Sequence, residues 1–235
     1  MKTLLAVDGS DNSYESVHAL KYFARAEQLT LLHALNVPRP AYPMMLPEVA
    51  EDLYKTVEQN MREDGERLLG SVSHRILTLA PCATLIVNGP VKAMKQILLP
   101  LEGPSDAEAA IRFLQLKPFH EAVELTLMTV LPWTEPPWPS GAAEAAAAAA
   151  TEMLEKQTEY IEGVAERLCA IGYKAHGVAL LGTPSTMILQ EAATLRSDLI
   201  LMGTRGRQGI TRFVLGSVSH AVLHKMPCPV LAFHQ

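Results

Sequence analysis

The second half of the chain alternates between short apolar runs and longer segments whose apolar positions recur every three or four residues. The short runs are typical of strands buried on both faces of a sheet, and they cover residues 96–101, 122–131, 174–181, 198–202 and 229–233. The longer segments predict helices over residues 105–115, 142–171, from Pro184 onward, and 213–225. Strands that alternate with helices predict an α/β fold with a doubly wound, mostly parallel sheet.

Individual residues mark the ends of some of these helices. Ser105 is placed to cap the helix that begins there, and Gly172 is placed to close the long Ala-rich helix. The Ala tract looks like a low-complexity linker, but Ala is the best helix former, so the composition favours a helix.

The same order of elements occurs twice along the chain. Residues 69–87 align with residues 215–233 without a gap, and 10 of the 19 positions are identical, at an offset of 146. Near the N-terminus, residues 4–9 match residues 98–103 at an offset of only 94. The difference between the two offsets means that the first repeat lacks the segment corresponding to residues 169–214.

The first repeat is therefore predicted to be a truncated copy of the second. It keeps strands over residues 3–7, 30–35 and 83–87 and helices over residues 12–26 and 48–68, and it lacks the third and fourth strands. We expect two domains, a truncated one over residues 1–90 and a complete one over residues 91–235.

Composition and charge exclude several classes of protein. Of the 235 residues, 49% are hydrophobic and 19% are charged, which is enough apolar material for a core. The net charge of −5 argues against a nucleic-acid-binding protein, and no apolar run reaches the roughly 18–20 residues that span a membrane. Three cysteines form no disulfide framework, so we expect a cytoplasmic protein with Cys82 and Cys228 as buried thiols.

The most informative segment joins the fourth strand of the second repeat to its last helix. It reads Gly203-Thr204-Arg205-Gly206-Arg207-Gln208-Gly209, followed later by Gly216-Ser217-Val218-Ser219. Glycines let backbone amides approach an oxyanion closely, and the start of a helix favours phosphate. Arg205, Arg207 and Arg212 add cations to an otherwise acidic chain. A phosphorylated ligand explains this pattern. The alternative is that the glycines only turn the chain and the arginines are solvated.

The spacing of this segment is specific. It is neither a P-loop nor a dinucleotide fingerprint, because Gly-x4-Gly-Lys-[Ser/Thr] and a Gly-x-Gly-x-x-Gly after the first strand are both missing. Gly203-x2-Gly206-x9-Gly216-Ser217, which closes a five-stranded α/β repeat, resembles the ATP-binding motif of the universal stress proteins. The resemblance covers the whole chain as two repeats and implies the strand order 3-2-1-4-5.

The resemblance also implies a ligand and the residues that hold it. The ligand is ATP, with ADP and AMP as alternatives and Mg²⁺ as a companion ion. The nucleotide-binding residues implied for the second repeat are Pro100, Glu102, Val130, Gly203, Gly206, Arg207, Gly216, Ser217, Val218 and Ser219. Val130 is implied to lie near adenine, and the glycines and serines near the phosphates and ribose. Glu102 stands where ATP-binding members carry Asp.

The first repeat carries only part of this set. Asp8, Gly70, Ser71 and Ser73 match the motif, but no residue corresponds to Gly203 or Gly206. Half a phosphate cradle is expected to bind poorly, so we expect one nucleotide site in the chain, in the second repeat.

Other chemistry is weakly supported. His74 and His220 occupy equivalent positions and favour a structural or interface role, while His18, His33, His120, His176, His224 and His234 show no metal-ligand spacing. No Gly-x-Ser-x-Gly elbow supports a Ser-His-Asp triad. The sequence thus favours an ATP-binding regulator or scaffold that at most hydrolyses ATP slowly. The alternatives are the same fold acting without nucleotide, and a nucleotidyl-transfer enzyme.

The apolar edge strands predict an assembly. Residues 230–233 and 85–87 are apolar, and an exposed apolar edge favours pairing with another strand. We expect a homodimer through edge strands, as the family resemblance also implies. Pairing of the two halves within one chain is the competing arrangement.

Overall fold

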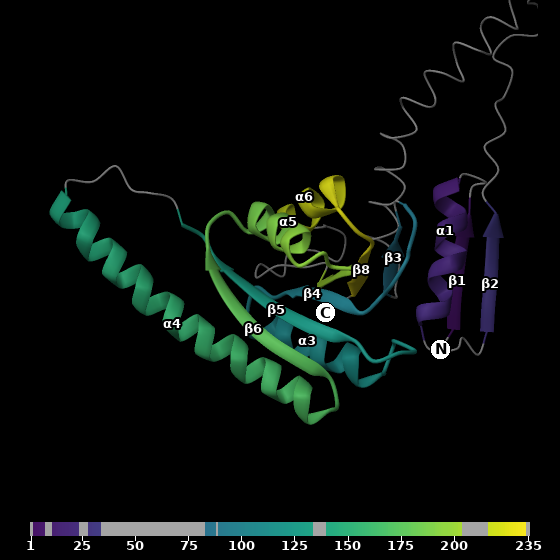
Figure 1. Cartoon of the computed structure of the whole chain (residues 1–235), viewed down its shortest axis with the longest axis horizontal. Coiled ribbons are helices and arrows are strands. Elements are labelled where there is room, and N and C mark those ends of the chain that lie inside the picture. Colours follow the sequence, from purple (N-terminus) through teal and green to yellow (C-terminus); the bar gives the residue numbers. More distant parts are fainter. Residues whose placement is uncertain are drawn as a thin grey trace, which may run out of the picture.

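The second half of the chain forms a complete α/β unit in the computed structural model (Figure 1). The structure describes residues 2–7, 11–23, 28–33, 83–87, 89–133, 140–203 and 216–233. The elements of the second half, in chain order, are β4 (Gln96–Pro100), α3 (Pro104–Gln115), β5 (Glu124–Leu131), α4 (Ser140–Ala170), β6 (Lys174–Leu181), α5 (Pro184–Thr194), β7 (Leu199–Gly203), α6 (Ser217–Lys225) and β8 (Val230–Phe233). Each predicted strand and helix of this half has its counterpart here.

The described part of the first half forms a smaller unit beside it. Its elements are β1 (Lys2–Val7), α1 (Asp11–Ala19), the 3-10 helix η1 (Leu20–Tyr22) and β2 (Gln28–His33). The last described strand of the first half, β3 (Thr84–Ile86), belongs to the main sheet instead. β1 and β2 pair in parallel as a separate two-stranded sheet. The predicted helix over residues 48–68 and the seam of the truncation lie outside the described residues, so the truncation stays a prediction.

The main sheet has six strands in the order β3-β8-β7-β4-β5-β6. The five strands of the second half are parallel to one another. Numbered along the repeat, their order is 3-2-1-4-5, as the family resemblance implies. The chain runs outward from β4 through β5 to β6 and then returns to the other side of β4 to form β7. The direction of winding therefore reverses between β4 and β7.

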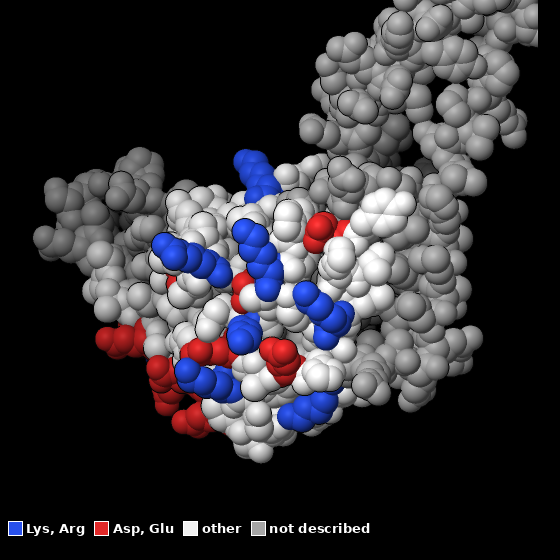
Figure 2. Space-filling view, turned by 45° about the vertical axis from the view of Figure 1, so that its right-hand side comes forward, with Lys and Arg blue, Asp and Glu red and all other residues white. Residues whose placement is uncertain are grey.

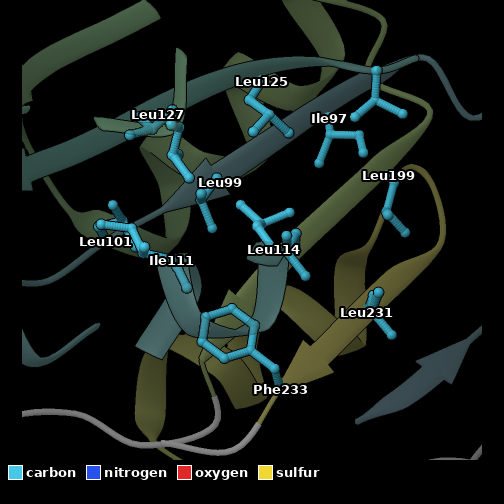
Figure 3. Close-up of a cluster of buried hydrophobic side chains, with 14 of the residues drawn as sticks. Ile97, Leu99, Leu101, Ile111, Leu114, Leu125, Leu127, Leu199, Leu231 and Phe233 are labelled. Carbon is cyan, nitrogen blue, oxygen red and sulfur yellow. The ribbon is translucent and has the colours of Figure 1, made fainter. Parts of the chain in front are cut away.

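Helices cover both faces of this sheet because successive side chains of each strand point to opposite faces. Ile97 and Leu99 belong to a cluster with residues of α3 and α4, whereas Leu98 packs in a second cluster with residues of α5 and α6. Figure 3 shows the first cluster, with Leu114 of α3 and Phe233 of β8 among its side chains. Strands buried on both faces account for the continuous apolar runs of the sequence.

The prediction for the C-terminal end of α4 is confirmed, and the prediction for the N-terminal end of α3 is wrong. Gly172 closes α4 with a φ of 91°, which glycine adopts without steric cost. Ser105, however, does not cap α3. The cap residue is Gly103, Pro104 is the first helical residue, and no side chain caps the helix. Pro suits that position because it lacks the amide hydrogen that would otherwise be unpaired there.

The edge strands pair within the chain. β3 runs antiparallel to β8, with Leu85 opposite Leu231. The edge of β8 that was expected to meet another copy is thus covered by the first half of the same chain, which is the competing arrangement. The edge strands of this sheet are β3 and β6, and the prediction of a homodimer is left with these and with the edges of the β1-β2 sheet.

The first half also docks through aromatic residues and backbone hydrogen bonds. The Tyr22 hydroxyl donates to the carbonyl of Lys92 at 2.8 Å, and the amide of His120 donates to the carbonyl of Tyr22 at 2.8 Å. The rings of Phe23 and Phe119 lie 5.7 Å apart, centroid to centroid. These contacts join η1 and Phe23 to the segments that flank the second-half unit.

Candidate functional site

The predicted ligand residues of β4, β5 and β7 and of the segment after β4 lie at one edge of the sheet. β4 ends at Pro100 and is followed by Glu102, Val130 is the next-to-last residue of β5, and β7 ends at Gly203. The carboxyl ends of parallel strands lie at the same edge, and ligands of open α/β sheets bind there, at the point where the winding reverses. That point lies between β4 and β7, beside Glu102 and Gly203.

One hydrogen bond joins β7 to α6, the two elements that flank the predicted phosphate-binding segment. The Ser219 hydroxyl donates to the carbonyl of Gly203 at 3.2 Å, and Ser219 is buried. This bond ties the first turn of α6 to the end of β7, so the two ends of the predicted phosphate cradle meet. Ser219 was predicted to contact the nucleotide. In the structure its hydroxyl donates to a backbone carbonyl, and its contact with a nucleotide stays a prediction.

The N-terminus of α6 offers a place for an anion. Its cap residue, Gly216, is extended, and no side chain of the described residues caps the helix. The amides of Ser217, Val218 and Ser219 are in the first turn, where intrahelical partners are lacking and the helix dipole is positive. A phosphate is the group that best satisfies such amides.

The remaining predicted residues divide into two groups. Pro100, Val130 and Val218 are partly exposed, and Val130 and Val218 pack against the core cluster of α5 and α6. These three side chains lie at the edge of the core, where a ligand can reach them. Gly206 and Arg207 lie outside the described residues, as do Arg205, Arg212 and the first-half residues Asp8, Gly70, Ser71 and Ser73.

Asp106 belongs to the same corner of the molecule and was missed in the sequence. Its Oδ2 accepts a hydrogen bond from the amide of Glu102 at 2.9 Å, which holds the loop between β4 and α3. Its Oδ1 is buried and has no hydrogen-bond partner among the described residues. Burial raises the pKa of Asp106 to about 6. The hydrogen bond from the Glu102 amide lowers that pKa and the charge of Glu102 raises it, both by less. The one sign of Asp106 in the sequence is that it is an acidic residue in the first turn of a predicted helix.

The raised pKa predicts an unusual pH dependence of stability. The folded state holds the Asp106 proton more tightly than the unfolded state, so stability falls as pH rises from about 4 to about 6, and the cost is present in full above pH 6. Asp106→Asn keeps an oxygen for the Glu102 amide and cannot ionise. The difference in free energy of unfolding between this variant and wild type should therefore shift in favour of the variant by on the order of 2 kcal/mol when the pH is raised from 4 to 7.

Urea unfolding at both pH values measures this change, and Glu108 supplies a control of opposite sign. A side-chain hydrogen bond from Arg167 lowers the pKa of the exposed Glu108, and the guanidinium contacts both carboxylate oxygens, at 2.6 and 3.1 Å. Glu108→Gln should therefore lose more stability at pH 7 than at pH 4. An Asp106→Asn variant that keeps the pH profile of wild type would contradict the raised pKa.

The described residues show few other groups suited to chemistry. Cys228 is buried, as expected, and burial raises the pKa of its thiol to about 12, while Cys82 lies outside the described residues. No helix of the described residues is long and apolar enough to cross a membrane.

On the face in Figure 2, basic and acidic side chains are interspersed, without the continuous basic stripe typical of a nucleic-acid interface.

Comparison with known proteins decides the family. The model of the universal stress protein family matches residues 94–234, more than half of the chain. The chain belongs to the universal stress protein family. The matched segment contains the whole second-half unit, from just before β4 to the end of β8.

Individual relatives agree with this assignment. A universal stress protein of Methanocaldococcus jannaschii is 32% identical over 152 residues, which cover 63% of this chain and 86% of the relative. One from Thermus aquaticus is 42% identical over 82 residues, which cover 34% of this chain and 60% of the relative.

A solved universal stress protein from Archaeoglobus fulgidus has a TM-score of 0.59 and 18% identity, over 99% of this chain and 95% of that one. This likeness concerns the fold alone.

Proposed function

We propose that this universal stress protein binds one adenine nucleotide per chain and acts as a regulator or scaffold in the stress response. The observation that carries the proposal is the bond from Ser219 to the Gly203 carbonyl. It brings the end of β7 and the uncapped N-terminus of α6 together at the point where the sheet reverses its winding. Backbone amides and glycines thus converge where ligands of this fold class bind.

Each part of the nucleotide is assigned to a part of this edge. The phosphates lie against Gly203, Gly206 and the first turn of α6, with Arg207 supplying positive charge. The adenosine end lies toward Pro100, Glu102 and Val130 at the ends of β4 and β5. ATP is the proposed ligand, with ADP and AMP as alternatives. Mg²⁺ would enter with the phosphates and neutralise part of their charge.

We propose regulation rather than efficient catalysis. Neither the motif nor the described residues place a general base beside the phosphates, and hydrolysis would need a group that activates water. A slow ATP hydrolysis is compatible with this site. The cytoplasm is the proposed location, and assembly into a homodimer is proposed through an edge other than that of β8.

Binding stoichiometry tests the proposal directly. Calorimetric titration of the nucleotide-free protein with ATP and magnesium should fit one site per chain, because the first half has no counterpart of Gly203 or Gly206. Acid release of co-purified nucleotide, followed by chromatography, identifies which adenine nucleotide the protein carries.

The titration also separates the alternatives. Two equivalent sites per chain would mean that the first half is completed by other residues, against the proposal. Absence of binding by ATP, ADP and AMP would favour the same fold acting as an interaction module without nucleotide.

A further inference from the structure

Two histidines lie next to each other on one face of α6. His220 and His224 are four residues apart, so they occupy neighbouring positions one helical turn apart. Their Nε2 atoms are 3.2 Å apart and their ring centroids 4.4 Å apart. Both side chains are exposed. From the sequence, His220 was expected to have a structural or interface role, so it was not considered together with His224 as a pair of metal ligands.

The separation of the two nitrogens matches what a metal ion requires. Imidazole nitrogens bind Zn²⁺ at about 2.0–2.1 Å. Two such nitrogens in tetrahedral geometry are therefore about 3.3–3.4 Å apart, and at right angles about 2.9 Å. The observed 3.2 Å lies between these values. Little side-chain movement is needed for both rings to coordinate one ion.

We propose that His220 and His224 chelate one late divalent transition-metal ion, of the Zn²⁺ or Cu²⁺ class. Imidazole suits these ions, and for a given site Cu²⁺ binds more tightly than Zn²⁺. Mg²⁺ prefers oxygen ligands, so this site is distinct from any magnesium that accompanies the nucleotide. No group of three or more His, Cys, Asp or Glu suited to a metal occurs among the described residues. The two imidazoles are the protein ligands of the proposed site, and water is the proposed further ligand.

The proton positions follow from the chemistry of the rings. Without metal, one ring donates its Nε2 hydrogen to the Nε2 lone pair of the other, which is one way to account for the close contact. With metal, both Nε2 atoms offer lone pairs and the ring protons reside on the Nδ1 atoms. Metal binding therefore requires a change of tautomer in one of the two rings.

Calorimetric titration of the full chain, free of nucleotide, with Zn²⁺ tests the site. Wild type should bind one ion that is lost or weakened at least tenfold in His224→Gln and in His220→Gln, since even changes outside the coordinating ligands cost about 10–100-fold in metal affinity. With Cu²⁺ as the probe, the electron paramagnetic resonance spectrum should show coupling to two imidazole nitrogens in wild type and to fewer in each variant.

Two control variants separate chelation from other effects. His120→Gln removes an exposed histidine outside α6 and should bind Zn²⁺ as wild type does. His224→Gln combined with Lys225→His keeps the number of histidines but places them five residues apart, on different sides of the helix, so it should bind no better than His224→Gln. The proposal is overturned if His224→Gln binds Zn²⁺ as tightly as wild type, or if the double variant restores binding.

Discussion

Saturating ATP with magnesium is expected to raise the melting temperature of the wild-type protein by about 5–10 °C. A ligand present at roughly a hundred times its dissociation constant, and bound only by the folded state, adds about 2.7 kcal/mol to stability. For a protein of this size, each kcal/mol raises the midpoint by roughly 2–4 °C. Thermal unfolding followed by circular dichroism, with and without nucleotide, measures the shift.

Gly206→Val is expected to abolish this shift. A branched side chain at that position blocks the close approach of phosphate to the backbone, while the melting temperature without nucleotide should change little. Gly206→Ala is a milder test and should weaken binding. Arg207→Ala should reduce affinity modestly, and more at low salt than at high salt, because salt screens an exposed cation.

The first half provides the matched control. Gly70→Val changes the residue that corresponds to Gly216 in the truncated repeat, and the ATP-induced shift should be the same as in wild type. If wild type shows no shift with ATP, ADP or AMP, nucleotide binding is wrong as the function. The Zn²⁺ titration of α6 is carried out without nucleotide, so its outcome is independent of this result.

Gly177→Ala is expected to destabilise the protein by about 3 kcal/mol, the upper part of the usual range for overpacked cores. Gly177 lies in β6 where α4 crosses it. A Cβ atom there would be 2.8 Å from Cγ2 of Ile161 and 2.9 Å from the amide nitrogen of Glu162. It would also be 2.9 Å from the carbonyl carbon of Ile161. A side chain can rotate away, but the backbone of a packed helix cannot.

Gly163 lies in α4, two residues after Ile161, and the same substitution there is expected to have the opposite effect. A Cβ at Gly163 meets no atom within 4 Å, and Ala is favoured over Gly inside a helix by up to about 1 kcal/mol. Gly163→Ala should therefore raise the midpoint of urea unfolding while Gly177→Ala lowers it. Equal midpoints for the two variants would show that α4 does not pack on β6 as described.

The sequence was most informative where strands are buried on both faces. The apolar runs around Leu98 and Leu201 are continuous because both neighbouring layers are apolar, and they appear as β4 and β7. Gly172 was correctly placed at the end of α4 because the left-handed backbone there demands glycine. Ser105 was misplaced because Ser is favoured both as a cap and within the first turn, and only the neighbouring Gly103 and Pro104 decide between them.

Pairs of residues that only the folded chain brings together were missed. The partner of Asp106 is a backbone amide, which has no signature in the sequence. Ser219 was recognised as part of the motif, but its bond to Gly203 spans sixteen residues and depends on how β7 and α6 pack. His220 and His224 were not paired in the sequence, because only the structure shows that their rings turn toward each other.

The sequence by itself determined the element order of the second half and, through its family motif, the strand order. It also predicted the loop most suited to phosphate. These depend on local periodicity and on residues close together in the chain. Only the tertiary structure decided which edge β3 covers, because Leu85 and Leu231 are far apart in the chain and an apolar edge accepts any apolar strand. It also decided the burial of Asp106, because desolvation depends on the layers that pack around a side chain and not on the side chain itself.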